Sequence, residues 1–302
     1  MISGFTLVRN GVLFDYPFRE SIRSLLPIVD ELIVNVGVGE DQTLAEIDRL
    51  QAETGGEKIQ VFESVWPLDD PEKKKSGLIL SEQTNLALDR CRGEWCIYLQ
   101  ADEILHENDT AILRDSLEKA SKRAEIDALV FDYKHFYGSY DVVQYSRSTY
   151  RREIRAIRRS SGVRSIGDAQ SFRYPDGSKP RATLTGARIF HYGWVRSPEA
   201  MKEKTFFMDQ LYHGDPGQPA LASRTPHTGD NYRYKKIWGL NRFREEHPSV
   251  MSARIAAKNW NWDIERSPLV WAWSDAKRVL LDLVERVTGW RMFEYRSYRL
   301  LD

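Results

Sequence analysis

The stretch GEWCIYLQADEILHE, from Gly93 to Glu107, decides the fold class. Its apolar run, 95–99, stops at a polar and acidic corner, Gln100-Ala101-Asp102-Glu103. A short run this apolar is typical of a strand in the centre of a sheet that is covered on both faces. A central strand that ends in carboxylates indicates a functional site at that end.

The residues before this stretch alternate between expected strands and expected helices. The expected strands are 5–8, 31–36, 58–62 and 95–99, and the expected helices are 15–27, 43–50 and 81–91. Such alternation is typical of βαβ units and predicts a doubly wound α/β domain with a parallel sheet. Ligands in such sheets bind beyond the carboxyl ends of the strands, which is where residues 100–103 would lie.

The pattern changes after residue 127. Further strands are expected at 127–141, 152–159 and 187–195, with no long helix between the first two, and a helix is expected at 197–213. This predicts a mixed or antiparallel second half of the same sheet. We expect one domain over 1–213, a Gly/Pro-rich loop or linker over 214–231, and a helical extension over 232–302 that holds six of the nine tryptophans.

Composition narrows the class of protein. The 302 residues include 44 Lys plus Arg and 44 Asp plus Glu, so overall charge gives no argument for nucleic acid or a membrane as partner. The two cysteines, Cys91 and Cys96, fit a reducing compartment and core thiols. Neither a signal peptide nor a bilayer-spanning run is evident. We expect a cytoplasmic protein, or one that touches the inner face of a membrane.

Two side chains are candidates for a metal site. Asp102, with its neighbour Glu103, offers oxygen ligands at a strand end, which suit Mg²⁺ or Mn²⁺. Such an ion would neutralise a diphosphate and ease its departure. His191, after an apolar strand, would offer an imidazole to the same cation. A solvated strand end and a hydrogen-bonded core histidine are the alternatives.

A run of arginines covers 146–173. It holds eight arginines against two acids, Glu153 and Asp168. Because arginine pairs well with phosphate, the run could hold an anionic donor, an acceptor or a lipid head group, and a solvated strand face is the alternative. Arginine neighbours would keep Asp168 ionised, so that it could serve as a general base. A carboxylate that only pairs with those arginines is the other interpretation.

The C-terminal segment, 276–301, predicts an amphipathic helix. Its apolar stripe, at helical spacing, comprises Val279, Leu280, Leu283, Val284 and Val287, and basic residues flank it. Such a helix packs on its own domain or at a dimer interface. Alternatively, it lies on an anionic membrane surface.

Together these residues resemble the family 2 glycosyltransferases, which have the GT-A fold. The stretches that carry the resemblance are 5–43, 85–103 and IFHYGWV at 189–195. They are similar to the family's opening strand, helix and second strand, to the strand that leads into its D-x-D motif, and to the late strand that returns a metal-ligand histidine. The resemblance implies a Rossmann-like mixed sheet covered by helices, over about residues 3–212.

The resemblance also implies roles for single residues. Asp102 falls on the last Asp of D-x-D, the usual contact to metal and diphosphate. Val8 and Arg9 lie where the family cradles the nucleotide base. Asp41 lies in a loop that lines the same pocket, and Asn85 matches an asparagine near the diphosphate.

Two positions depart from the family pattern. Gln100 replaces the first Asp of D-x-D, and Asn35 falls where many relatives carry the Asp that reads uracil. The implied function is an inverting glycosyltransferase with a nucleotide-diphosphate sugar as donor, a divalent cation on Asp102 and His191, and Asp168 as base. The implied acceptor is a glycan or a lipid-linked intermediate. A non-catalytic sugar-nucleotide or glycan binder, and a nucleic-acid binder that uses the arginine run, are the alternatives.

Overall fold

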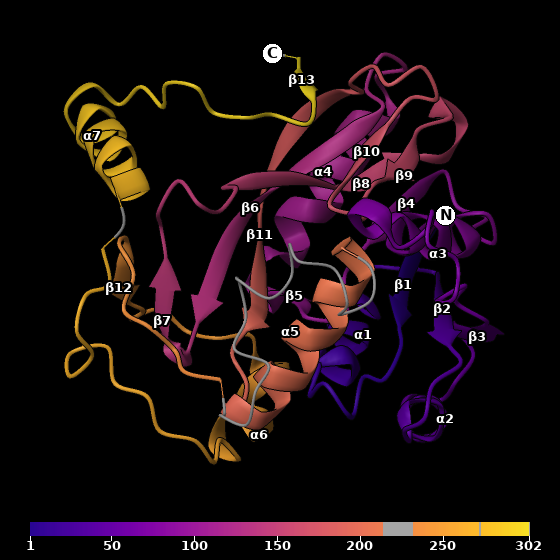
Figure 1. The fold of residues 1–302 in the computed structure, drawn as a ribbon. Helices are drawn as coiled ribbons and strands as arrows, with labels where there is room; N and C mark the ends of the chain where they lie inside the picture. Colours follow the sequence, from indigo (N-terminus) through magenta and orange to yellow (C-terminus); the bar gives the residue numbers. More distant parts are fainter. Residues whose placement is uncertain (214–231, 272, 302) are drawn as a thin grey trace.

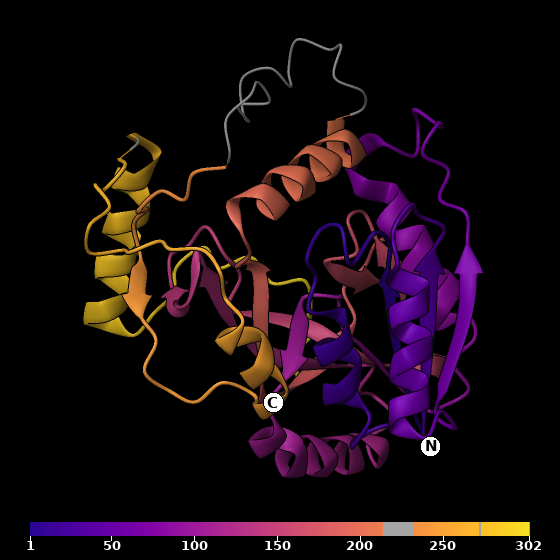
Figure 2. The same ribbon diagram turned by 90° about the horizontal axis from the view of Figure 1, so that it is seen from below.

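The computed structural model describes residues 1–213, 232–271 and 273–301. The predicted linker, 214–231, lies outside the described residues. Helices lie on both faces of a large central sheet, as Figures 1 and 2 show from two directions. The sheet is mixed and has 11 strands in the described part of the chain. The predicted α/β fold class is therefore confirmed.

The N-terminal half of the sheet is parallel. Its strands, in spatial order, are β4 (Trp95–Tyr98), β1 (Ile2–Val8), β2 (Glu31–Gly37) and β3 (Ile59–Ser64). The connecting helices are α1 (Phe18–Leu25), α2 (Thr43–Thr54) and α3 (Leu78–Leu88). All pairings within this half are parallel, as the alternation predicts. The carboxyl ends of β1 and β4 consequently meet at one edge of the sheet.

The second half is mixed. Its strands are β5 (Glu103–Leu105), β6 (Ala128–Tyr137), β7 (Ser139–Gln144), β8 (Arg152–Arg158) and β11 (Arg181–Trp194). β8 runs antiparallel to both β4 and β6, so it joins the two halves. β11 lies parallel to β6 along its length and antiparallel to β5. This arrangement brings β11 beside the strand end that holds Asp102. A separate hairpin consists of β9 (Arg164–Ile166) and β10 (Ser171–Arg173).

The two faces of the sheet carry separate cores. Val34 and Val36 of β2 pack with residues of α1, α2 and α4 (Thr110–Ser121). Ile33 belongs to the other core, which includes residues of α3 and of α5 (Pro198–His213). Neighbouring residues of one strand thus serve opposite faces, as period-2 side-chain alternation requires. Cys91 and Cys96 are free, buried thiols of the second core.

The C-terminal extension is not a separate layer. It contains α6 (Ser252–Ala256) and α7 (Trp273–Thr288), and its two short strands join the main sheet. β12 (Leu240–Arg242) pairs with β7, and β13 (Arg299–Leu300) pairs with β11. α7 lies at the side of the molecule, beyond β12 (Figure 1). Among the described residues, no helix is both long and apolar enough to cross a bilayer.

One of the two carboxylates at the end of β4 has a structural role. Glu103 is fully buried and binds Arg155 of β8 through two contacts, Oε2 to Nε at 2.7 Å and Oε1 to Nη2 at 2.8 Å. Tyr133 donates a further hydrogen bond to Oε1 at 2.8 Å. The expectation that Glu103 accompanies Asp102 as a ligand is therefore wrong, because its side chain is fully used by partners within the sheet.

We expect the Glu103→Gln variant to be about 3–5 kcal/mol less stable than the wild type, because it leaves the Arg155 guanidinium buried without its counter-charge. Denaturant titration measures this difference in the free energy of unfolding. The matched control is Glu118→Gln, which removes an exposed ion pair to Lys122 and should change stability by less than about 1 kcal/mol. Equal losses in the two variants would contradict the structural role of the buried pair.

Candidate active site

A pocket of about 500 Å³ opens at the carboxyl ends of β1 and β4. Its floor includes Val8 and Arg9 from the end of β1 and the turn at 100–102 after β4. α5 forms one wall with a face that contributes Lys204, Phe207 and Tyr212. The pocket thus lies at the sheet edge where the sequence predicts a ligand site, and α5 encloses it.

Asp102 lies at the centre of the charges around this pocket. Its Oδ2 atom accepts a hydrogen bond from Lys204 Nζ at 3.2 Å and lies 3.7 Å from Arg196 Nη2. Burial alone would raise the pKa of this carboxyl, but the charges of Lys204, His191 and Arg196 hold the pKa well below its usual range. Asp102 is therefore a carboxylate at neutral pH.

His191 faces Asp102 with a defined ring nitrogen. The Nε2 atom of the neighbouring His135 lies 2.7 Å from the Tyr150 carbonyl, which can only accept, so His135 carries its proton there. Burial and the charge of His191 lower the pKa of His135 to about 3, so its Nδ1 is bare. That atom accepts from Nδ1 of His191 at 2.9 Å. Nε2 of His191 is thereby left to face Asp102 Oδ1, at 3.6 Å.

These two groups fit a divalent cation. Mg²⁺ and similar ions commonly take one or two protein ligands and complete their shell with substrate phosphates and water. A ligand histidine normally donates from its other ring nitrogen, as His191 does toward His135. Gly193 keeps the space open, because a Cβ there would lie 2.5 Å from His191 Nε2 and 3.1 Å from Asp102 Oδ2. No group of three or more His, Cys, Asp or Glu ligands exists among the described residues, so a cation on Asp102 and His191 would need its other ligands from water and a bound molecule.

Asp168 reaches the same pocket from the loop between β9 and β10. The Tyr212 hydroxyl of α5 donates a hydrogen bond to Asp168 Oδ2 at 2.8 Å. Burial, together with the charge of Asp168, raises the pKa of Tyr212, so the tyrosine remains a donor. Within the described residues, the other carboxylate oxygen accepts one long backbone bond, at 3.2 Å from the amide of Gln170. The structure therefore places the predicted base, the predicted metal ligand Asp102 and His191 around one pocket.

An aromatic and cationic wall forms the end of the pocket near β1. The Arg9 guanidinium lies 5.4 Å from the ring centre of Phe207, and Phe14 stacks on the same ring at 5.1 Å. Trp66 is packed beside them, and its indole Nε1 is buried without a hydrogen-bond partner. This nitrogen lies against Gly37 of β2, where a Cβ would come within 2.5 Å of it, so Trp66 contributes its ring rather than a hydrogen-bond donor to the pocket.

Two predicted contact residues do not line the pocket. Asp41 accepts hydrogen bonds from the backbone of Leu13 and from Thr43, and so fixes the loop that precedes α2. Asn85 pairs with both backbone groups of Ser165 in β9. Both side chains thus hold neighbouring segments together. Of the five residues for which donor contact was predicted, Val8, Arg9 and Asp102 line the pocket.

The arginine run is mostly a set of ion pairs. Six of its eight members lie beside carboxylates from elsewhere in the chain: Arg147 with Asp282 and Glu285, Arg151 with Glu285 and Glu294, Arg152 with Asp132, Arg155 with Glu103, Arg158 with Glu94, and Arg164 with Asp89. The interpretation of the run as an anion-binding patch is therefore not supported. The charges of these six arginines are neutralised by partners outside the run.

Several pocket residues were missed in the sequence. Lys204 and Tyr212 fall on the predicted helix 197–213, on the same face as the apolar Met201 and Met208. The sequence signal for Lys204 was a lysine within an apolar helical stripe. Because burial of an unpaired ammonium is costly, such a lysine indicates a nearby carboxylate or ligand. Burial and the charge of Arg196 lower the pKa of Lys204 to about 8, against the opposing effect of Asp102.

No protein-family model matches the chain, and no curated protein matches its sequence. Solved structures resemble it at low identity. TarS residues 1–349 from S. aureus, in complex with UDP, shares 15% identity with a TM-score of 0.39, over 70% of this chain and 64% of that chain. The mannosyltransferase PcManGT from Pyrobaculum calidifontis, in complex with GDP-Man and Mn²⁺, shares 15% identity with a TM-score of 0.32, over 42% of this chain and 34% of that chain.

GalNAc-T7, with UDP, GalNAc and Mn²⁺, shares 13% identity with a TM-score of 0.38, over 70% of this chain and 48% of that chain. This chain spans less than two thirds of the length of the TarS fragment that it matches.

Proposed function

We propose that the chain is a glycosyltransferase that moves a sugar from a nucleotide-diphosphate donor to a glycan or a lipid-linked acceptor. One observation carries the proposal: a single pocket at the strand ends contains Asp102 beside His191, and also Asp168. The first pair suits a leaving diphosphate, and the second carboxylate suits deprotonation of an attacking hydroxyl.

The donor would extend across the floor of the pocket. The aromatic wall of Phe207 and Trp66, with the Arg9 guanidinium, suits the flat face of a nucleobase. Lys204 would place its ammonium beside the diphosphate, since it already lines the pocket next to Asp102. Asp102 and His191 would hold a divalent cation, Mg²⁺ or Mn²⁺, which would supply positive charge to the departing diphosphate.

The reaction would be a single displacement with inversion. An acceptor hydroxyl attacks the anomeric carbon, the new carbon–oxygen bond forms as the bond to the diphosphate breaks, and the hydroxyl proton passes to Asp168. The hydrogen bond from Tyr212 orients that carboxylate and leaves its other oxygen for the acceptor. Lys204 stabilises the negative charge that grows on the leaving group. We infer a cytoplasmic location, where nucleotide sugars would be the donor supply.

Metal removal tests the donor site directly. The protein is mixed in turn with UDP-, GDP-, ADP- and dTDP-sugars. We expect one of these sugar nucleotides to raise the melting temperature of the protein by about 5 °C in the presence of Mn²⁺, because a ligand at a large excess over its Kd stabilises only the folded state. EDTA should remove most of that shift, since the diphosphate would then face the Asp102 carboxylate without the cation between them. Thermal-shift measurement checks both results.

The control for this experiment is Mn²⁺ or EDTA without any nucleotide, which should leave the melting temperature nearly unchanged. A sugar nucleotide that shifts the melting temperature equally with Mn²⁺ and with EDTA would exclude the cation from donor binding but keep the donor site. No shift with any of the four would contradict the proposed function.

A further inference from the structure

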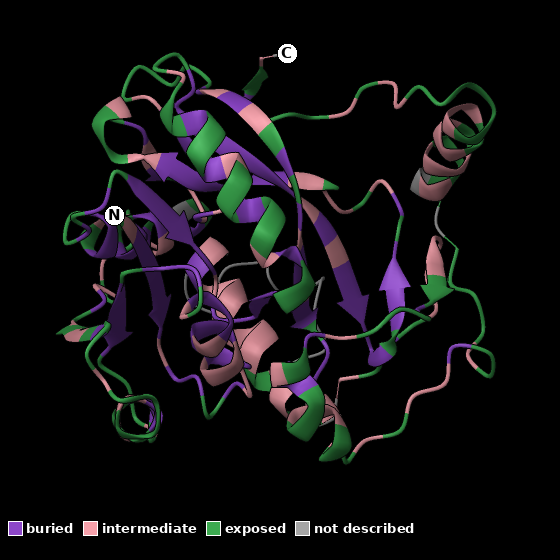
Figure 3. Ribbon diagram, turned by 180° about the vertical axis from the view of Figure 1, so that it is seen from behind, coloured by how far each residue is buried: buried purple, intermediate pink, exposed green. Residues whose placement is uncertain are grey.

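Helix α7 presents its polar side to the body of the protein and its apolar side to solvent. None of the α7 residues whose side chains the structure describes is buried, as Figure 3 shows from behind. An ordinary surface helix has the opposite orientation, with its apolar stripe facing the core. The expectation that the stripe packs on the chain's own domain is therefore wrong.

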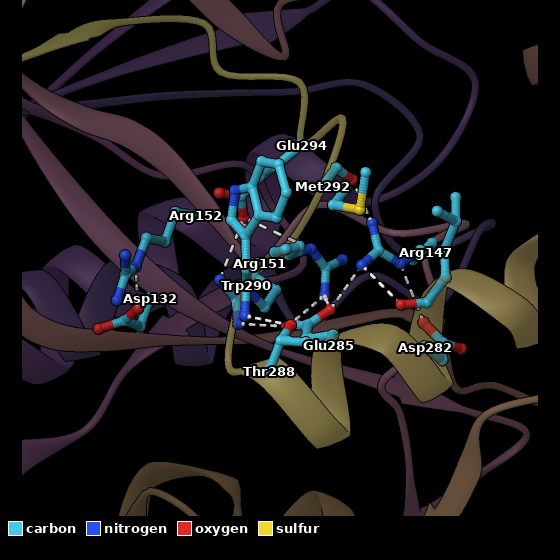
Figure 4. A network of polar contacts seen from close by, with 12 residues as sticks. Asp132, Arg147, Arg151, Arg152, Asp282, Glu285, Thr288, Trp290, Met292 and Glu294 are labelled. Atoms are coloured by element: carbon cyan, nitrogen blue, oxygen red, sulfur yellow. Dashed lines mark hydrogen bonds and ion pairs between the residues drawn. The ribbon is translucent and has the colours of Figure 1, made fainter.

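The inner side of α7 is held by ion pairs to one arginine of the body. Arg147 is largely buried and lies 3.2 Å from Asp282 and 3.0 Å from Glu285. It also donates to the backbone carbonyls of Leu281 and Met292, at 3.0 and 2.6 Å. Figure 4 shows the contacts with Asp282, Glu285 and Met292 converging on the guanidinium group. The guanidinium group has five N–H donors in a fixed planar arrangement, so one arginine can bind several acceptors at once. The contacts of Arg147 therefore fix both the position and the orientation of α7.

A second arginine extends the same network. Arg151 lies 2.9 Å from Glu285 and 3.3 Å from Glu294, which follows the helix (Figure 4). On the same side, the indole of Trp238 donates to Asp282 at 2.8 Å. Rotation of α7 to bury its apolar stripe would break this network and expose its partly desolvated charges. The outward orientation of the stripe is thus a stable feature of the fold.

α7 and the segment after it carry six exposed apolar side chains. We call this set the outer face, and it comprises Trp273, Leu280, Leu283, Val287, Trp290 and Phe293. Trp273, Leu280 and Val287 follow at seven-residue spacing, so they share one side of the helix. Trp273 is 92% exposed and Val287 is 85% exposed. Several large apolar side chains this exposed on one segment are typical of an interaction site, whereas single exposed hydrophobic residues are common on any surface.

Charge on this part of the molecule is divided by side. The acidic residues of α7 and the following segment are paired with basic groups: Asp275 with Arg278, Asp282 with Arg147, Glu285 with Arg147, Arg151 and Arg291, and Glu294 with Arg151, Arg291 and Arg296. The two basic residues of α7 that flank the outer face, Lys277 and Arg286, are both exposed. The apolar stripe therefore has a positive border.

We propose that the outer face binds the surface of an anionic phospholipid membrane, with α7 in the plane of the interface. Aromatic and aliphatic side chains with a basic border are the features that place a helix at that depth. A second copy of this chain fits less well, because the carboxylates of α7 are already paired and would offer no counter-charge to Lys277 and Arg286 of the other copy. The proposal does not depend on the donor site, so either can fail alone.

Co-sedimentation with vesicles tests the proposal. We expect the wild type to bind vesicles of phosphatidylcholine mixed with phosphatidylglycerol, and to bind phosphatidylcholine alone at least about tenfold more weakly, because the basic border meets anionic head groups. The variant Leu280→Glu/Val287→Glu should bind the anionic vesicles at least about tenfold more weakly than the wild type. Its melting temperature should be unchanged, since both side chains are exposed.

The matched control is Leu86→Glu/Ile112→Glu, which adds the same two charges at exposed apolar positions on α3 and α4. It should bind anionic vesicles nearly as the wild type does. Equal loss of binding in both double variants would overturn the proposal, and so would wild-type binding that is equally strong with and without anionic lipid. A third result would also overturn it: the wild type does not bind vesicles but forms a dimer, and Leu280→Glu/Val287→Glu dissociates that dimer. The outer face would then bind a second copy of the chain.

Discussion

Replacement of Asp102 by Asn should abolish the Mn²⁺-dependent part of donor binding and lower the rate of sugar transfer by about 10²–10³-fold. The amide keeps the shape of the side chain but removes the negative charge opposite His191 Nε2, which lies 3.6 Å away. Calorimetric titration with the sugar nucleotide, with Mn²⁺ and with EDTA, measures the effect on binding. A radiochemical transfer assay measures the effect on rate.

The same substitution has a consequence for stability. Lys204 and Arg196 both approach the Asp102 carboxylate, so its loss leaves two cations close together without their shared counter-charge. We expect a melting temperature several degrees lower, which binding of an anionic diphosphate would partly restore. Asp89→Asn is the matched control, because that carboxylate pairs with Arg164 on the surface. Asp102→Asn that retains Mn²⁺-dependent donor binding would place the cation elsewhere.

The first half of the fold could be predicted because its signals are local. The apolar run 95–99 is short and is followed at once by polar residues, which identifies a central strand and its end. The pairing of β1 with β2 and β4 then follows from βαβ geometry, since a parallel neighbour needs a crossover connection. Nothing distant in sequence is required for these assignments.

The role of Glu103 could not be predicted in the same way. Its partner Arg155 lies in β8, and only the antiparallel pairing of β8 with β4 brings the two groups together. An acidic pair at a strand end is therefore ambiguous in sequence. Asp102 ends the turn after β4 and lines the pocket, whereas Glu103 begins β5 and meets a buried arginine, and nothing local in the sequence tells which of the two does so.

The arginine run was misinterpreted for a related reason. Local counting gives an excess of positive charge over 146–173, but the carboxylates that neutralise Arg147 and Arg151 lie near the C-terminus, in and after α7. Charge patterning within a window indicates a binding surface only when the fold brings no counter-charge from elsewhere. His191 and Asp168 could be singled out from their place after an apolar strand and within the arginine run, whereas Lys204 and Tyr212 reach the pocket because α5 crosses it.

Replacement of Asp168 by Asn should lower the transfer rate by about 10²–10⁴-fold and leave donor binding almost unchanged. Asn is close to the size of Asp, so it fits the space that Asp168 occupies. That space is tight, because a Cβ added to Gly77 would lie 3.1 Å from the Cβ of Asp168. The amide cannot accept a proton from the acceptor hydroxyl, so the loss should appear in kcat rather than in the Kd of the sugar nucleotide. Steady-state kinetics together with calorimetry separates these two effects.

Tyr212→Phe provides the comparison that distinguishes a base from a structural carboxylate. It removes the hydrogen bond to Asp168 Oδ2 but leaves the carboxylate charged, so the rate should fall by no more than about tenfold. If Asp168 served only to hold α5 through Tyr212, the two variants would lose rate and stability to a similar extent. If instead Asp168→Asn kept most of the wild-type rate, another group would have to take the proton. A large loss of kcat in Asp168→Asn alone, at an unchanged melting temperature, is the result that general-base catalysis requires.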